Sequence, residues 1–308
     1  MKILVTGKNG QVGFELMRSL SPLGQVVGVD VKECDLTQSA SVERLLDRVK
    51  PDIIVNPAAY TAVDQAEDES TIVHAVNVQA PKILARYAAR KNIPMIHFST
   101  DYVFDGEKEG AYSEEDQVNP KSVYGKTKWL GEEEVRKMAA KHIIIRTSWV
   151  FGSHGENFLK TMLKLSQERE KLSVVSDQFG APTSALFLAR LAKALLMSHQ
   201  ESPRSSQSGI YHAVPHGYTS WHGLAQMVIG LIQDMKILTR VTLENVLPIP
   251  ATEYPLSAPR PYNSRLCNKK LANYLAVIDP ENPSPLQLQY WQTEVAAYVH
   301  QYAELIKQ

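Results

Sequence analysis

The chain has 308 residues, with 33 basic and 33 acidic side chains, so its formal net charge is zero. This length suffices for a large core in one or two domains, and a balanced charge gives no field that would attract nucleic acid or anionic lipid. No apolar run reaches the ~18 residues that a membrane span needs. The two cysteines, Cys34 and Cys267, show neither metal-type spacing nor a disulfide framework. We therefore expect a cytoplasmic protein with no nucleic-acid or membrane partner.

The N-terminal segment carries a pattern that is typical of a dinucleotide site. Lys2–Thr6 is a short apolar run suited to a buried parallel strand, and Gly7, Gly10 and Gly13 follow it at once. Apolar residues then recur at helical spacing from 14 to 20. Glycines let a backbone turn tightly against a pyrophosphate, and a helix start offers it free N–H groups. The spacing differs from the simplest fingerprint, so a glycine-rich turn of another α/β protein stays an alternative.

Asp30 ends a second apolar run, residues 25–29, about 20 residues beyond the glycines. A carboxylate there can accept hydrogen bonds from the adenosine ribose and repels a 2′-phosphate, which favours NADH. Lys32 lies close enough to weaken that preference, and a loop acid without a ligand is the alternative. The sequence therefore leaves the choice between NADPH and NADH open.

Strands and helices alternate up to about residue 150. Strands are expected at 52–55, 94–98 and 142–145, and helices at 71–90 and 122–141. This alternation predicts an α/β fold, a doubly wound parallel sheet of the Rossmann type, with ligands bound beyond the carboxyl ends of the strands.

After residue 151 the alternation weakens, and prolines and polar turns multiply. Helices are expected near 158–169, 184–197, 220–235 and 285–306, residues 203–209 read as a loop, and the prolines of 248–261 exclude a long helix. We expect residues 1–150 to form the dinucleotide-binding domain. Residues 151–308 are expected to be mainly a smaller, mixed α/β substrate-binding part, with some later segments returning to the first domain.

Tyr124 and Lys128 form a Tyr-x-x-x-Lys pair in an expected helix, where residues four apart share one face. A cation beside a phenol lowers its pKa, and such a phenol can exchange a proton with a carbonyl oxygen. The pair alone is weak evidence for a catalytic role, because a half-buried tyrosine beside a solvated lysine is common. Following a nucleotide fingerprint, however, it indicates an oxidoreductase.

Several longer stretches together resemble the extended short-chain dehydrogenase/reductase family. They are residues 7–13, 99–104, 146–151, 177–183 and 260–264, and the resemblance runs essentially end to end. Within the family, the chain is similar to members that use NADPH or NADH to reduce the C4 keto group of a dTDP-linked sugar, dTDP-4-dehydro-L-rhamnose. A nucleotide-sugar epimerase or dehydratase, and a non-catalytic NAD(P)-binding regulatory subunit, remain as alternatives.

The resemblance also implies roles for individual residues. Thr100 would hydrogen-bond the C4 oxygen, Tyr124 would donate the proton, and Lys128 would lower the pKa of Tyr124 and hold the nicotinamide ribose. Substrate contacts are expected at Thr100, Asp101, Trp149 and Arg260, although Arg260 could equally fasten the proline-rich loop. Cofactor contacts are expected at Gly7, Gly10, Gln11, Val12, Gly13, Asp30, Asp35, Leu36, Ala59, Tyr60, Thr61, Phe98, Tyr124 and Lys128.

The family is also associated with a magnesium-linked dimer built from glutamates. Glu15 and Glu294 match two of them, but Leu186 stands where a further acid would be expected. A leucine cannot bind Mg²⁺, which requires oxygen ligands. We therefore expect no metal site, while a homodimer could still form through other contacts.

Overall fold

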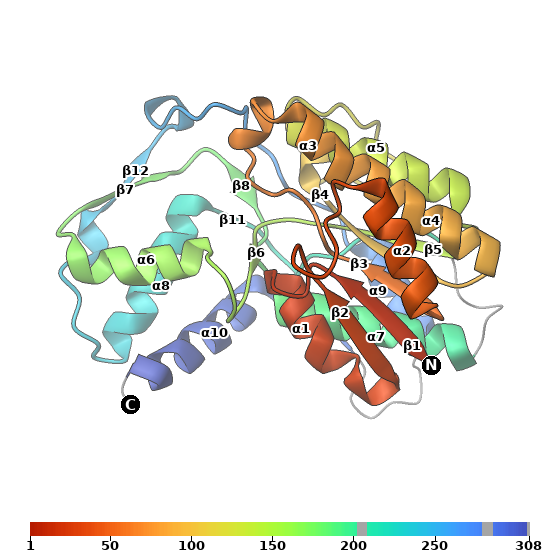
Figure 1. The fold of residues 1–308 in the computed structure, drawn as a ribbon. Coiled ribbons are helices and arrows are strands. Elements are labelled where there is room, and N and C mark those ends of the chain that lie inside the picture. Colours follow the sequence, from red (N-terminus) through yellow and green to blue (C-terminus); the bar gives the residue numbers. More distant parts are fainter. Residues whose placement is uncertain (202–207, 279–285, 307–308) are drawn as a thin grey trace.

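The computed structural model describes residues 1–201, 208–278 and 286–306, and it is built around one six-stranded parallel sheet (Figure 1). The order across the sheet is β10-β5-β4-β3-β1-β2. The strands are β1 (Lys2–Thr6), β2 (Gln25–Val29), β3 (Ile53–Asn56), β4 (Met95–Thr100), β5 (His142–Thr147) and β10 (Gly209–His212). The expected doubly wound parallel sheet is confirmed.

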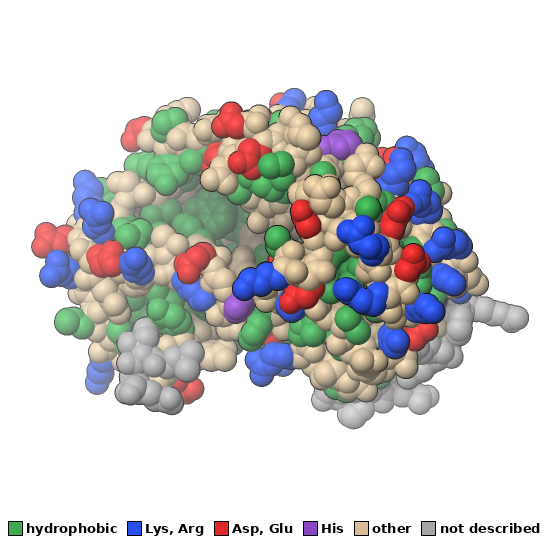
Figure 2. All heavy atoms as spheres, viewed as in Figure 1, with side chains coloured by type: hydrophobic (Ala, Val, Ile, Leu, Met, Phe, Trp, Pro, Cys, Tyr) green, Lys and Arg blue, Asp and Glu red, His purple; other side chains and the backbone are tan. Residues whose placement is uncertain are grey.

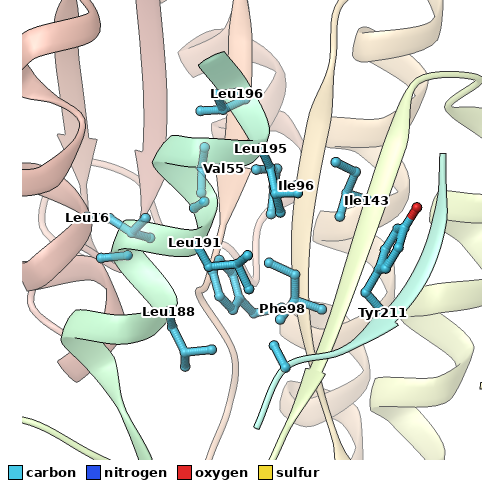
Figure 3. Close-up of a cluster of buried hydrophobic side chains, with 14 of the residues drawn as sticks. Leu16, Val55, Ile96, Phe98, Ile143, Leu188, Leu191, Leu195, Leu196 and Tyr211 are labelled. Carbon is cyan, nitrogen blue, oxygen red and sulfur yellow. The ribbon is translucent and has the colours of Figure 1, made fainter. Parts of the chain in front are cut away.

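Helices cover both faces of the sheet, because successive strand residues point to opposite sides. Ile3 and Val5 belong to one hydrophobic core, which is closed by α1, α7 and α9, whereas Leu4 belongs to the core under α2, α4 and α5. Figure 3 shows part of the first core, where Leu191 of α7 lies beside Phe98 of the sheet and Leu195 beside Ile96. The bounds are α1 (Gln11–Ser19), α2 (Ser39–Val49), α4 (Ala80–Lys91), α5 (Val123–Met138), α7 (Ala185–Glu201) and α9 (Lys269–Ile278).

The helix expected at 71–90 is present, but it is interrupted. It begins as α3 (Ser70–His74), widens into a π-turn at Ala75–Gln79 and continues as α4. A π-turn adds a residue to one helical turn and occurs often at functional sites. Here it buries the side chain of Asn77 against α5.

A second lobe lies beside the sheet domain (Figure 1). It has its own apolar core, formed by residues such as Leu159, Leu224 and Val295. Its helices are α6 (Phe158–Glu168), α8 (Trp221–Asp234) and α10 (Trp291–Ile306). Three strand pairs complete the lobe and its junction: β7 (Leu172–Val175) with β12 (Val246–Ile249), β8 (Phe179–Gly180) with β11 (Thr219–Ser220), and β6 (Val150–Phe151) with β9 (Thr183–Ser184).

The second half of the chain contributes to both lobes. Strand β10 pairs in parallel with β5, and α7 and α9 pack on the sheet. Helices α2 and α9 were not expected from the sequence. The prolines at 248–261 do exclude a long helix, since this region holds β12 and one short 3₁₀ turn at Ala251–Glu253. Most of the loop expected at 203–209 lies outside the described residues, as does the start of the helix expected from 285. Within the described ranges, none of the helices has the length and apolarity of a membrane span.

Candidate active site between the lobes

A cavity of about 810 Å³ lies beyond the carboxyl ends of β1, β3, β4 and β5. Figure 2 shows the molecule hollowed between the two lobes, with hydrophobic side chains in the hollow. Seventeen of the expected site residues line the cavity: Gly7, Gly10, Gln11, Val12, Gly13, Asp30, Asp35, Leu36, Ala59, Tyr60, Thr61, Phe98, Thr100, Asp101, Tyr124, Lys128 and Trp149. The parallel sheet thus brings together residues that are far apart in the sequence.

The glycine turn has the shape that a pyrophosphate needs. Gly7 has φ of +61°, which side-chain-bearing residues rarely adopt, and a Cβ on Gly13 would lie only 1.9 Å from the carbonyl oxygen of Gly7. Gly10 precedes α1 without a side-chain cap, so the first N–H groups of that helix stay available. The turn therefore fits the diphosphate of a dinucleotide.

Replacing Gly13 with alanine is expected to weaken NADPH binding at least about tenfold, because the added methyl group must displace the turn that faces the pyrophosphate. Cofactor titration monitored by NADPH fluorescence measures the effect. Gly110→Ala is the matched control, since a Cβ there meets its nearest atom only at 4.0 Å. Equal NADPH affinity in both variants would contradict the assignment of the turn.

The acidic residues after β2 shape the loops of the cofactor pocket. The Asp30 carboxylate accepts the backbone N–H groups of Asn9 (2.9 Å) and Val31 (2.8 Å), so it fastens the glycine turn to the end of β2. Asp35 accepts the backbone N–H (2.9 Å) and the hydroxyl (2.7 Å) of Thr37. Both carboxylates therefore have structural partners in addition to the roles expected from the sequence.

The three expected catalytic residues meet at one end of the cavity. Thr100 ends β4, and its hydroxyl donates to Asp101 Oδ1 at 3.0 Å. Tyr124 and Lys128 lie one turn apart at the start of α5, which Ser122 caps by accepting the N–H of Gly125 at 3.1 Å. The Lys128 ammonium donates to the carbonyl oxygen of Phe98 at 2.7 Å, which ties α5 to β4.

The electrostatics differ from the expectation at Tyr124. Burial raises the pKa of Tyr124 to about 12, although a hydrogen bond with Thr100 acts in the opposite direction. The Lys128 ammonium is directed at the carbonyl oxygen of Phe98, and burial is the largest influence on the phenol pKa. The phenol consequently keeps its proton at neutral pH, which suits a proton donor.

Burial also shifts the pKa values of the neighbouring groups. It lowers the pKa of Lys128 to about 8, against the raising effect of the Glu132 carboxylate. It raises the pKa of Asp101 to about 6, because the charged form of a carboxyl group is disfavoured away from water. Perturbed titratable groups that gather in a cleft are a signature of an active site.

Of two further residues that were expected to contact the substrate, Trp149 lies in the cavity wall and Arg260 does not. Trp149 lines the cavity, in a left-handed conformation with φ of +49°. Arg260 is not part of the cavity wall: its guanidinium donates to Asp64 Oδ2 at 2.6 Å and to the carbonyl oxygen of Ala258 at 3.0 Å. This arrangement matches the second reading of Arg260, in which it fastens the proline-rich loop.

The chain closely matches known proteins over nearly its whole length. The family model described as the RmlD substrate binding domain matches residues 1–303. The chain belongs to the RmlD family. A dTDP-4-dehydrorhamnose reductase of Burkholderia thailandensis is 43% identical over 283 residues, covering 91% of this chain and 95% of that protein.

Two solved structures extend this likeness to three dimensions. A dTDP-4-dehydrorhamnose reductase of Clostridium acetobutylicum superposes with a TM-score of 0.84 at 35% identity, covering 98% of this chain and 100% of the other. The enzyme of the same name from Bacillus anthracis, solved in complex with NADP, gives a TM-score of 0.82 at 31% identity, covering 98% and 99%. The resemblance inferred from the sequence is confirmed.

The RmlD-family chain also holds its catalytic helix with buried polar contacts that the sequence did not reveal. Glu132 of α5 and Arg146 of β5 form a two-pronged ion pair of 2.9 and 2.7 Å, and their side chains are 1% and 3% exposed. Asn77 of the π-turn accepts the N–H of Tyr60 at 2.8 Å and donates to Thr127 at 3.2 Å. It therefore links the cofactor loop to the residue before Lys128.

In this RmlD-family chain, a second groove lies on the far side of α1, bordered by Glu15, Leu186 and Glu294. Glu15 accepts the hydroxyl of Ser153 at 3.0 Å, and Glu294 accepts the backbone N–H of Ser184 at 3.0 Å. Among the described residues, no group of three or more His, Cys, Asp or Glu side chains could hold a metal ion. The three positions that the sequence related to dimerisation thus share one surface.

Proposed function

We propose that this protein reduces the C4 keto group of dTDP-4-dehydro-L-rhamnose to give dTDP-L-rhamnose, with NADPH or NADH as the cofactor. The observation that carries the proposal is the meeting of Thr100, Tyr124 and Lys128 beside the glycine turn, in a chain 43% identical to a dTDP-4-dehydrorhamnose reductase. The names of the relatives favour a reductase over an epimerase, a dehydratase or a regulatory subunit.

The nicotinamide, when bound, supplies the hydride that adds to C4. Tyr124 donates its phenolic proton to the C4 oxygen, which the high pKa of that buried group permits. The Thr100 hydroxyl, which donates to Asp101 in the free protein, turns to donate to the same oxygen and stabilises its developing charge. The Lys128 ammonium adds a positive charge next to the phenol, which favours the tyrosinate left after proton transfer.

Asp101 and Trp149 are the proposed contacts to the sugar. Asp101 is 3% exposed and orients the Thr100 hydroxyl, so its carboxyl group fits a role in placing the C4 oxygen. Trp149 supplies an aromatic ring at the same cavity. In this proposal residues 1–150 bind the dinucleotide, and the part after 151 completes the substrate side.

Both cofactors are compatible with the pocket. The Asp30 carboxylate is already paired with backbone N–H groups, and Lys8 beside it forms an ion pair with Glu33 at 2.7 Å. The end of β2 thus has both acidic and basic side chains where the adenosine ribose of the cofactor is expected to bind. The Bacillus anthracis relative binds NADP, and we propose that this chain accepts NADPH or NADH.

The decisive test is an absorbance assay of NADPH and NADH oxidation with dTDP-4-dehydro-L-rhamnose, with dTDP-L-rhamnose identified as the product. Substrate-dependent oxidation is the expected result. Protein that binds both ligands yet oxidises neither cofactor would contradict the proposal.

Turnover is expected to persist in EDTA without added Mg²⁺, because Leu186 supplies no oxygen ligand at the groove that holds Glu15 and Glu294. The same assay, run with EDTA and with EDTA plus excess Mg²⁺, measures this. Strict loss in EDTA with recovery in Mg²⁺ would refute it.

We also propose that the protein is cytoplasmic and that it forms a homodimer through contacts other than a metal ion. Sedimentation at several protein concentrations would reveal the dimer.

A further inference from the structure

Thr147, the last residue of β5, has a buried hydroxyl group. The residue is 6% exposed, and its Oγ1 has no hydrogen-bond partner in the part of the chain that the structure describes. The side chains that follow are engaged. Ser148 donates to the carbonyl oxygen of Ala181 at 3.0 Å. The ring of Trp149 stacks on that of Trp221. Because buried hydroxyl groups are nearly always paired, the exception at Thr147 requires an explanation.

The position of Thr147 in the cavity wall supplies this explanation. Ser99 Oγ and Asp101 Oδ2 belong to the same wall, and they too are buried without a partner among the described residues. In a binding site, such groups find their partners on the ligand. A threonine hydroxyl can turn toward a bound ligand by rotation about the Cα–Cβ bond. The unpaired hydroxyl of Thr147 therefore fits a binding surface.

Thr147 lies next to the proposed reaction centre. It is the register partner of Thr100 on the neighbouring parallel strand, so both side chains leave the sheet on the same side. This is the side that α1 and α7 cover, because Ile145, two residues before Thr147, belongs to the core that these helices close. Tyr124 and Lys128 belong to α5, which covers the other side. Thr147 thus flanks the reaction centre from the side of α1.

The start of α1 is close to the end of β5. Gln11, the first residue of α1, donates from Nε2 to the carbonyl oxygen of Val150 at 3.3 Å, three residues after Thr147. The glycine turn that fits a pyrophosphate leads into the same helix start. Asp30, where the adenosine ribose is expected, follows β2, on the far side of β1 from β5. A dinucleotide whose pyrophosphate binds at α1 therefore extends its nicotinamide arm toward β4 and β5.

We propose that the Thr147 hydroxyl group binds the carboxamide of the nicotinamide ring. This inference rests on the proposed function, which places a nicotinamide beside Thr100 and Tyr124. A carboxamide offers both an N–H donor and a carbonyl acceptor, and a hydroxyl group can pair with either. Holding the carboxamide restricts rotation of the ring about its glycosidic bond, and it thereby determines which face of the ring meets the sugar.

Thr147→Val replaces the hydroxyl by a methyl group of similar size, and calorimetry measures the effect on binding. The affinity for NADPH is expected to fall about three- to tenfold, which corresponds to the loss of one hydrogen bond. The affinity for 2′-phospho-ADP-ribose, which is NADPH without its nicotinamide ring, is expected to stay unchanged. Thr147→Ala also lacks the hydroxyl and is expected to show the same difference between the two ligands, so it serves where the valine variant fails to fold.

Two control variants separate the hydroxyl from the fold. Thr147→Ser keeps the hydroxyl and is expected to bind NADPH with nearly the original affinity. Thr183→Val is the matched control, since Thr183 is 0% exposed and donates to the carbonyl oxygen of Ala181 at 3.1 Å, but does not line the cavity. Its affinity for NADPH is expected to stay unchanged. Melting temperatures show that the variants are folded.

Three results would overturn the role of Thr147. Unchanged NADPH affinity in folded Thr147→Val excludes the contact, and an equal loss for 2′-phospho-ADP-ribose moves it away from the nicotinamide. A loss confined to the KM for dTDP-4-dehydro-L-rhamnose assigns the hydroxyl to the sugar. These binding measurements need no turnover. Absent turnover in unsubstituted protein that binds NADPH contradicts the proposed function, whereas the comparison of the two cofactor ligands still decides the role of Thr147.

Discussion

Tyr124→Phe is expected to lower turnover by about 10²–10⁴-fold while NADPH still binds with nearly its original affinity. The substitution removes one hydroxyl group, which is the proton donor in the proposed reaction, and leaves the glycine turn unchanged. The buried ring keeps its edge-on contact with Tyr102, at a centroid distance of 5.5 Å, so the fold of α5 is expected to persist. Turnover is measured with dTDP-4-dehydro-L-rhamnose, and binding by NADPH fluorescence.

Tyr102→Phe is the matched control for this change. Tyr102 lines the same cavity and loses the same hydroxyl group, but it has no lysine one helical turn away. We expect its variant to keep turnover within a few-fold of the original. If Tyr124→Phe also turned over at a near-normal rate, Tyr124 would have no part in the chemistry.

Arg146→Met is expected to reduce the free energy of unfolding by about 3–5 kcal/mol. The change leaves the Glu132 carboxylate, whose side chain is 1% exposed, without its guanidinium partner in the interior. The pair joins α5, which carries Tyr124 and Lys128, to β5. Urea unfolding followed by circular dichroism measures the loss, and NADPH binding shows whether the catalytic helix keeps its place.

Arg86→Met is the control, since it is the same replacement in an exposed ion pair. Arg86 meets Glu43 at 2.5 Å, with side chains 60% and 52% exposed, and such pairs contribute at most about 1 kcal/mol. Replacing Glu132 and Arg146 together by apolar residues is expected to recover much of the loss, because no unpaired charge remains. A cost for Arg146→Met no larger than that for Arg86→Met would show that the buried pair does not hold the helix.

The sheet domain was predictable where its signals are local. Apolar runs such as Lys2–Thr6 and residues at helical spacing identify their elements without knowledge of the partners. Helix α2 was equally readable, since Val42, Leu45, Leu46 and Val49 form one apolar face. In contrast, β10 is a short strand whose place beside β5 depends on a pairing across more than sixty residues, and local patterns do not report such pairings.

The same division holds for the site. The glycine turn and the Tyr124/Lys128 pair are motifs within one turn or one helix, so local spacing brought them out, and the resemblance to a known family gave them their roles. The contact of Trp221 with Trp149 links two lobes, and the pairing of Glu132 with Arg146 links a helix to a strand, so only the folded chain shows them. The raised pKa of Tyr124 was not foreseen for a related reason: it comes mainly from burial, which depends on tertiary packing.

The late position of β10 in the sequence affects which surfaces of the sheet are uncovered while the chain is being synthesised. The five strands that carry the cofactor and catalytic residues are synthesised first, but the edge of β5 stays unpaired until residues 209–212 follow. One face of the sheet likewise stays uncovered until α7 has been made. A nascent chain at that stage exposes an open strand edge and an apolar surface, the two features that promote aggregation. Biosynthesis of this protein therefore passes through an interval in which assistance by a chaperone is of most benefit, and that interval ends only after α6, the first helix of the second lobe, has been made.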